Sequence, residues 1–219
     1  GGGSNCAGGS GFVLIKYTTP DTVEFTVTYD SQGGSAFSNE LTTVGGSISS
    51  PGTPTRPGYT FNGWFVAPTG GSAIVFAEPN GYAHGRTADF TLYAQWTIRT
   101  YAVSFNGNSS TGGSVPVDLT KTHGVDLTLA SNSGSLVRTG YTFDGWNTAA
   151  DGSGTSYAER ALYGVDAAVT LYAKWTANSL TVTYNSQEGS SATGGSLSTT
   201  TGGTLASLPT TSREGYAFN

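Results

Sequence analysis

The chain has 219 residues, a net charge of −5, no methionine, one cysteine and 11% charged residues. This acidic balance argues against nucleic acid or an anionic membrane as a partner, and no apolar run approaches the ~18 residues of a membrane-spanning helix. A single cysteine also excludes an intrachain disulfide, so the aromatic residues, 12% of the chain, must supply much of the buried surface.

Residues 1–22 are expected to be a glycine-rich leader and the tail of a preceding domain. The first ten residues are Gly, Ser and Asn around Cys6-Ala7, too little apolar surface to fold. Phe12–Tyr17 is β-prone on both faces, typical of a buried strand. It belongs either to that preceding domain or to the edge of the next module. Because the chain starts without Met and stops inside a repeated motif, we expect a fragment of a longer polypeptide.

The segment Glu24–Asp30 opens the first repeated unit. Phe25, Val27 and Tyr29 alternate with polar residues, the period-two pattern of a half-buried strand. The pattern returns twice, as Tyr101, Val103, Phe105 and as Leu180, Val182, Tyr184. A glycine-containing loop follows each copy, where glycine supplies turn conformations that other residues resist.

The central motif is Gly-Tyr-Thr-Phe-Asn-Gly-Trp, ending at Trp64, and it returns with Asp in place of Asn, ending at Trp146. A third copy stops at Asn219, before its Gly-Trp. The tyrosine and phenylalanine share one strand face, but the tryptophan has the opposite parity. We therefore predict a β-bulge at Gly63 and Gly145 that turns the tryptophan onto the core side. The predicted core residues of this motif are Tyr59, Phe61, Trp64, Tyr141, Phe143 and Trp146.

A closing strand ends each complete copy, as Leu-Tyr-Ala-Gln-Trp-Thr and Leu-Tyr-Ala-Lys-Trp-Thr. Alternation places Trp96 and Trp175 on the core side. Tyr93 and Tyr172 fall on the opposite face, which makes them the candidate contact surface. Before the second closing strand, Tyr157–Tyr163 is the one helix candidate, and its two turns are marginal by themselves.

Self-similarity at a nearly fixed period identifies a tandem array of one module. Trp64 and Trp146 are 82 residues apart, and Trp96 and Trp175 are 79 apart. We predict repeat 1 at residues 23–97, repeat 2 at 98–176 and a truncated repeat 3 at 177–219.

Taken together, the Val-Thr-Tyr-Asp opening, the Gly-Tyr-Thr-Phe-x-Gly-Trp centre and the Thr-Leu-Tyr-Ala-x-Trp-Thr ending resemble the Listeria–Bacteroides repeat, which includes the B repeat of internalin-type surface proteins. The resemblance implies an α+β, strand-dominated β-grasp-like module, a twisted sheet of about four strands with a short helical or loop crossover. It also implies display on secreted or wall-attached bacterial proteins, as stalks and adhesive spacers. The family offers no catalytic residue to transfer.

Residues with the chemistry for catalysis or metal binding are few. His84 and His123 do not recur at matching positions, and we interpret both as surface-loop residues rather than catalytic bases. Cys6 has no base nearby in sequence. Asp151-Gly152-Ser153-Gly154 lacks the later acidic positions of a calcium loop, so we interpret it as a turn. Lys121 does not recur with the other lysines, which argues against a lysine cross-link. We predict no catalytic, metal or cofactor site.

The leading functional prediction is a non-catalytic, extracellular repeat region of a bacterial cell-surface protein, acting as a spacer with a role in adhesion. Host or cell-envelope glycans, or surface proteins, are the candidate partners, and no obligate oligomer is expected. One alternative is a carbohydrate- or mucin-binding module with exposed aromatics; another is an accessory segment of a larger secreted enzyme. Burial of the four tryptophans distinguishes the spacer from the carbohydrate-binding module.

Overall fold

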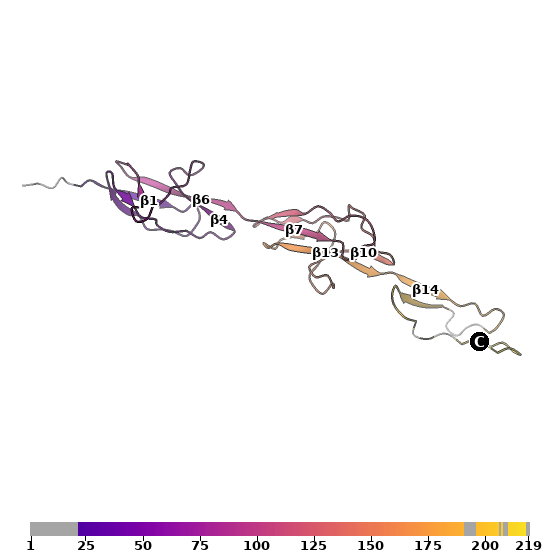
Figure 1. Ribbon diagram of the computed structural model, residues 1–219. Coiled ribbons are helices and arrows are strands. Elements are labelled where there is room, and N and C mark those ends of the chain that lie inside the picture. Colours follow the sequence, from indigo (N-terminus) through magenta and orange to yellow (C-terminus); the bar gives the residue numbers. More distant parts are fainter. Residues whose placement is uncertain (1–21, 191–195, 206, 208–209, 218–219) are drawn as a thin grey trace, which may run out of the picture. The chain divides into compact units, whose positions relative to one another are not determined.

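The computed structural model describes residues 22–190, 196–205, 207 and 210–217. The chain divides into two compact units, residues 1–97 and 98–219, and strands carry the secondary structure of each (Figure 1). Cys6 and the strand expected at Phe12–Tyr17 lie outside the described residues.

Six strands form the first unit: β1 (Glu24–Asp30), β2 (Glu40–Thr43), β3 (Ser47–Ile48), β4 (Tyr59–Phe65), β5 (Tyr82–Ala83) and β6 (Phe90–Ile98). Four of them make one sheet in the order β2-β1-β6-β4. The first and last strands are central and parallel, with Val27 opposite Phe90, while β2 pairs antiparallel with β1. The segment between β1 and β6 therefore acts as the long crossover that a parallel pair requires, and it contains the β3–β5 ladder.

The second unit repeats this plan with β7 (Thr100–Asn106), β8 (Leu119–Thr122), β9 (Leu127–Thr128), β10 (Tyr141–Asn147), β11 (Ser156–Tyr157), β12 (Leu162–Tyr163) and β13 (Val169–Ala177). Its main sheet has the order β11-β10-β13-β7-β8, again with the opening and closing strands parallel at the centre. A hairpin of β14 (Ser179–Thr183) and β15 (Ser196–Thr200) follows. Every residue of β14 is exposed.

The described residues contain no helix, so the strand-dominated part of the expected fold is confirmed and the helical option for the crossover is wrong. The candidate segment Tyr157–Tyr163 instead contributes to β11 and β12. Between them Arg160 adopts φ = 58°, which interrupts any helix. The rings of Tyr157 and Tyr163 pack edge to face, with centroids 5.7 Å apart. Residues six apart lie on different faces of a helix, so this contact requires the extended path.

Each complete repeat has a hydrophobic core of its own. In the first unit the buried cluster contains Val27, Tyr29, Ile48, Trp64, Leu92 and Ala94. In the second unit it contains Val103, Phe105, Leu129, Leu136, Trp146, Tyr163, Leu171 and Ala173. The opening strand, the central motif and the closing strand each contribute to both clusters, as alternation predicts.

The predicted bulge is confirmed in the second repeat. Phe143 lies opposite Trp175 and Trp146 opposite Ala173, so the register shifts by one residue between them. Gly145, within the shift, has φ = 91°, and Gly63 has φ = 127° at the equivalent place. Both values lie in the region that favours glycine. The extra residue turns the tryptophan side chain to the core face of the strand. Trp64 and Trp146 are accordingly only 2% and 0% exposed.

Candidate functional site

The predicted core aromatics occupy two different environments. Trp64 and Trp146 are buried, and their indole N–H groups donate to the carbonyls of Gly52 (3.0 Å) and Ala130 (2.9 Å). The other six are only partly buried. Phe61, Trp96, Phe143 and Trp175 pack against the two cores, whereas Tyr59 and Tyr141 contact an arginine. Two tryptophans are thus removed from solvent, whereas Trp96 and Trp175 keep part of the ring at the surface.

Trp96 and Trp175 each form a hydrogen bond to the loop that follows the opening strand of their repeat. The Trp96 indole donates to the Ser31 carbonyl at 2.9 Å, and the Trp175 indole donates to the Asn108 carbonyl at 3.0 Å. Because a tryptophan has a single polar hydrogen, both rings have satisfied it internally. What remains exposed on each ring is apolar edge and face.

The guanidinium carbon of an arginine lies over the tyrosine ring of the central motif in all three copies. The Arg56 Cζ is 3.8 Å from the Tyr59 ring centroid. The corresponding distances are 4.1 Å for Arg138 over Tyr141 and 4.3 Å for Arg213 over Tyr216. The guanidinium is attracted to the ring quadrupole, which restrains the arginine side chain.

The local sequence explains this stack. Each arginine begins a four-residue Arg-x-Gly-Tyr turn in which the tyrosine N–H donates to the arginine carbonyl, at 3.1, 2.9 and 3.1 Å in the three copies. The glycines have φ = 76°, 79° and 78°. A glycine with positive φ at the third position, with Pro57 at the second in repeat 1, is the signature of a type II turn. The turn brings the first and fourth side chains together.

In each complete repeat a side-chain amide anchors the loop that follows the opening strand. The Gln32 Nε2 donates to the carbonyls of Pro68 (2.9 Å) and Ala94 (2.6 Å). The Asn108 Nδ2 does the same with Ala150 (2.8 Å) and Ala173 (2.9 Å). Both residues have positive φ, 46° and 47°. Because each amide donates to carbonyls of two different chain segments, it holds this loop in a defined position.

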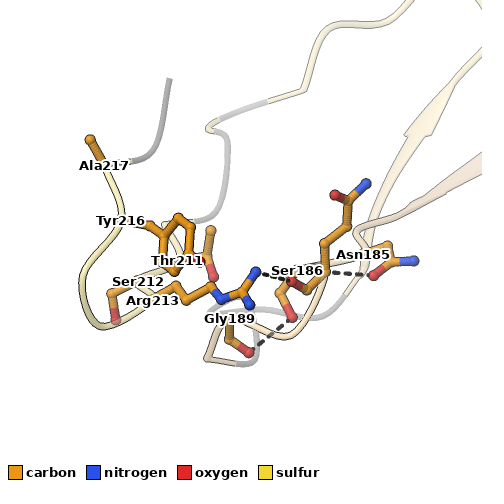
Figure 2. Close-up of a pocket in the computed structure, with 9 residues that line it drawn as sticks. Asn185, Ser186, Gly189, Thr211, Ser212, Arg213, Tyr216 and Ala217 are labelled. Carbon is orange, nitrogen blue, oxygen red and sulfur yellow. Dashed lines mark hydrogen bonds between the residues drawn. The ribbon is translucent and has the colours of Figure 1, made fainter.

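A surface hollow lined by the arginine and by the loop amide residue lies beside the arginine–tyrosine contact in every copy, and we call it the Arg–Tyr pocket. In repeat 1 it measures about 630 Å³, lined by Arg56, Tyr59, Gln95 and Trp96 among others. In repeat 2 it measures about 330 Å³, lined by Arg138, Lys174 and Trp175 among others. In the third copy it measures about 380 Å³, and Figure 2 shows Arg213 against Tyr216 at its side.

Sequence reasoning missed the Arg–Tyr pocket. Its signal was present, because Arg56, Arg138 and Arg213 each stand three residues before the motif tyrosine. Tyr93 and Tyr172, chosen instead as the contact surface, are partly buried and are absent from the linings of these pockets.

Two titratable residues, His84 and Lys121, are buried. His84 is only 8% exposed and bonds Thr42 Oγ1 at 2.9 Å, so the interpretation as a surface-loop residue is wrong for it. Burial, and secondarily the nearby Arg86 charge, lowers its pKa below the usual 6.5. Lys121 is 1% exposed and pairs with Asp166 at 2.6 Å. Strand parity was the available signal, because Lys121 shares a face with Leu119.

The remaining polar candidates form local structure. Asp151 accepts hydrogen bonds from the backbone N–H and the hydroxyl of Ser153, at 3.0 and 2.7 Å, and these bonds lower its pKa. Within the described residues no group of three or more His, Cys, Asp or Glu side chains converges as a metal site. The same part of the chain holds no helix long and apolar enough to cross a membrane.

Comparison with known proteins gives a consistent family match. The model of the Listeria-Bacteroides repeat domain matches residues 25–95, 101–174 and 181–219. Internalin H of Listeria monocytogenes is 34% identical over 163 residues, 74% of this chain and 27% of that protein. A protein of Evansella cellulosilytica, provisionally named a Gly-rich membrane protein, is 37% identical over 175 residues, 76% of this chain and 20% of that protein. The chain thus spans about a quarter of the length of such relatives.

Proposed function

Because the chain belongs to the Listeria–Bacteroides repeat family, we propose that it is a non-catalytic spacer region of a bacterial surface protein, displayed outside the cell. The observation that carries the proposal is the separate core of each complete repeat: the clusters around Trp64 and Trp146 share no residue. Modules that each bury their own core can be added or removed in series without disturbing their neighbours.

The sheet topology favours a module that resists unfolding when force is applied to its two ends. The opening and closing strands are adjacent in the sheet of each complete repeat. We interpret each repeat as a β-grasp-like module in which a loop with short strands takes the place of the helix. Abundant Ser and Thr with few charges, 11% of residues, give a solvated surface suited to display.

The proposal is tested in the complete protein that carries this segment. Residues 98–176 are deleted, or replaced by an unrelated folded module of equal length, and surface level and attachment to the natural target are measured. A spacer predicts that deletion impairs attachment at unchanged surface level and that the foreign module restores it. Failure of the foreign module to restore attachment would overturn a pure spacer role.

A further inference from the structure

We propose that the Arg–Tyr pocket of each complete repeat binds a carboxylate-bearing sugar unit of an acidic glycan. This goes beyond the spacer role, which requires no ligand. Four features carry it: a guanidinium in contact with a tyrosine ring and outside any ion pair, an apolar wall without a free polar hydrogen, a free amide oxygen beside it in repeat 1, and an internal carboxylate in the third copy.

The guanidinium is available and restrained. The described residues form four ion pairs, and neither Arg56 nor Arg138 belongs to any of them. Contact with the ring of Tyr59 or Tyr141 restrains the arginine side chain, so the fork loses less freedom on binding than a fully mobile arginine would. A planar fork of N–H donors matches the two oxygens of a carboxylate.

The wall of the pocket suits the ring of a sugar. Trp96 and Trp175 are partly buried and line the pockets beside the arginines. Their indole N–H groups are already bonded to their own loops, which leaves apolar ring surface for the C–H faces of a sugar. An arginine alone would accept many anions; an aromatic wall next to it selects for an anion attached to a flat, partly apolar body.

The residue before each tryptophan tunes the pocket. The Gln95 amide donates to the carbonyls of Ala67 (3.1 Å) and Gly70 (2.8 Å), so its oxygen is directed to accept from a sugar hydroxyl. Lys174 occupies the same position in repeat 2, where it also pairs with Asp144 at 3.0 Å. Asp144 already neutralises this lysine, so Arg138 is the cation that repeat 2 offers to a ligand.

Each pocket also contains a carboxylate that is engaged locally. Asp30 accepts the Gln32 N–H at 2.9 Å, and Asp151 accepts from Ser153. Their negative charge opposes an anionic ligand, as does the net charge of −5. The affinity per pocket is therefore expected to be low, and repetition along the chain compensates, because linked sites bind a multivalent glycan with avidity.

The third copy shows a carboxylate bound to this arginine. Arg213 pairs with Glu188 at 2.9 Å and donates to the Gln187 carbonyl at 3.4 Å. Glu188 follows the loop residue equivalent to Gln32 and Asn108, where the complete repeats have Gly33 and Ser109. Its carboxylate stands in for the carboxylate of the ligand. The complete repeats leave that place open.

The test titrates the 219-residue chain with tetragalacturonate, with maltotetraose as the neutral sugar and inorganic phosphate as the plain anion. Indole N–H signals in NMR spectra report binding for each tryptophan separately. The acidic tetrasaccharide should shift the signals of Trp96 and Trp175 much more than those of Trp64 and Trp146. The double variant Arg56→Gln/Arg138→Gln should weaken binding at least tenfold, whereas Arg213→Gln, the matched control, should leave it unchanged.

Unshifted Trp64 and Trp146 signals in the double variant verify that both cores remain folded. No binding of the acidic sugar, equal binding of maltotetraose, or full affinity in the double variant would each overturn the proposal. Equal effects of inorganic phosphate on the same signals would overturn sugar recognition in favour of a general anion site. The titration measures sugar binding alone and does not depend on attachment. If the foreign module fails to restore attachment although the chain binds no acidic sugar, the spacer role is overturned and this pocket does not account for the failure.

Discussion

The two complete repeats fill the same buried polar position in different ways. Thr42 lies opposite Phe25 in repeat 1, and Lys121 lies opposite Tyr101 in repeat 2. Thr42 pairs with the imidazole of His84, a neutral contact. Lys121 pairs with a carboxylate, that of Asp166. Either polar group is accommodated here because each has a partner, as expected when an unpaired buried group is the costly outcome.

The cores are what the repeats share, so disrupting them gives the largest expected effect. Trp64→Ala and Trp146→Ala should each lower the free energy of unfolding of their own repeat by about 3–5 kcal/mol, because each removes a buried indole and leaves a cavity. Urea unfolding followed by NMR signals of each repeat measures this. Equal destabilisation of both repeats by one substitution would show that the cores are not independent.

Removing the partner of the buried charge gives the next effect. Asp166→Asn should destabilise repeat 2, because the Lys121 ammonium loses its counter-charge. The loss should be smaller than for tryptophan, since Asp166 is 29% exposed and water can replace its carboxylate. Adding Lys121→Met should restore stability, because an apolar side chain of similar volume removes the charge. Thermal unfolding of the single and double variants tests the pair, and a double variant less stable than Asp166→Asn would contradict it.

The bulge glycines should differ between the repeats. A methyl group at Gly145 would meet the backbone carbonyl oxygen of Tyr157, whereas one at Gly63 would meet the Ala73 Cβ at 2.9 Å, in an exposed loop. Gly63→Ala should cost about 1–2 kcal/mol from positive φ alone, and Gly145→Ala should cost more. Chemical denaturation of both variants measures the difference, with Gly124→Ala, which has open space and φ = 70°, as control for φ alone.

The smallest expected effect is a difference between the two repeats in how their stability depends on pH. The His84 Nδ1 accepts the Arg86 N–H at 2.9 Å, so the neutral ring donates from Nε2 to Thr42. With its pKa lowered, the unfolded chain binds more protons, and repeat 1 loses stability as the pH falls below about 6.5.

Repeat 2 should respond at lower pH. Hydrogen bonds from Lys121 and then from the Gly124 N–H lower the pKa of Asp166 below 3.8, so its contribution is present above that value and lost as pH falls further. Unfolding at pH 7.5, 5.5 and 3.5 should show repeat 1 weakening first. His84→Gln should remove the first step, and its persistence in this variant would assign the step elsewhere.

Periodicity predicted the strands and the parity argument predicted the bulge, because both depend on local geometry that the sequence carries directly. The buried places of His84 and Lys121 were missed, because a polar residue is buried only when a partner distant in sequence reaches it. His84 is 42 residues from Thr42 and Lys121 is 45 from Asp166. The helix candidate failed for a related reason: contact between Tyr157 and Tyr163 on the core outweighed two turns of marginal local preference.

The parallel pairing of β1 with β6, and of β7 with β13, has a mechanical consequence. When the two ends of one repeat are pulled apart, the opening and closing strands are pulled in opposite directions along their length. All main-chain hydrogen bonds between them then bear the load together in shear, instead of opening one after another. Each repeat should therefore yield at a high force and in a single step under tension.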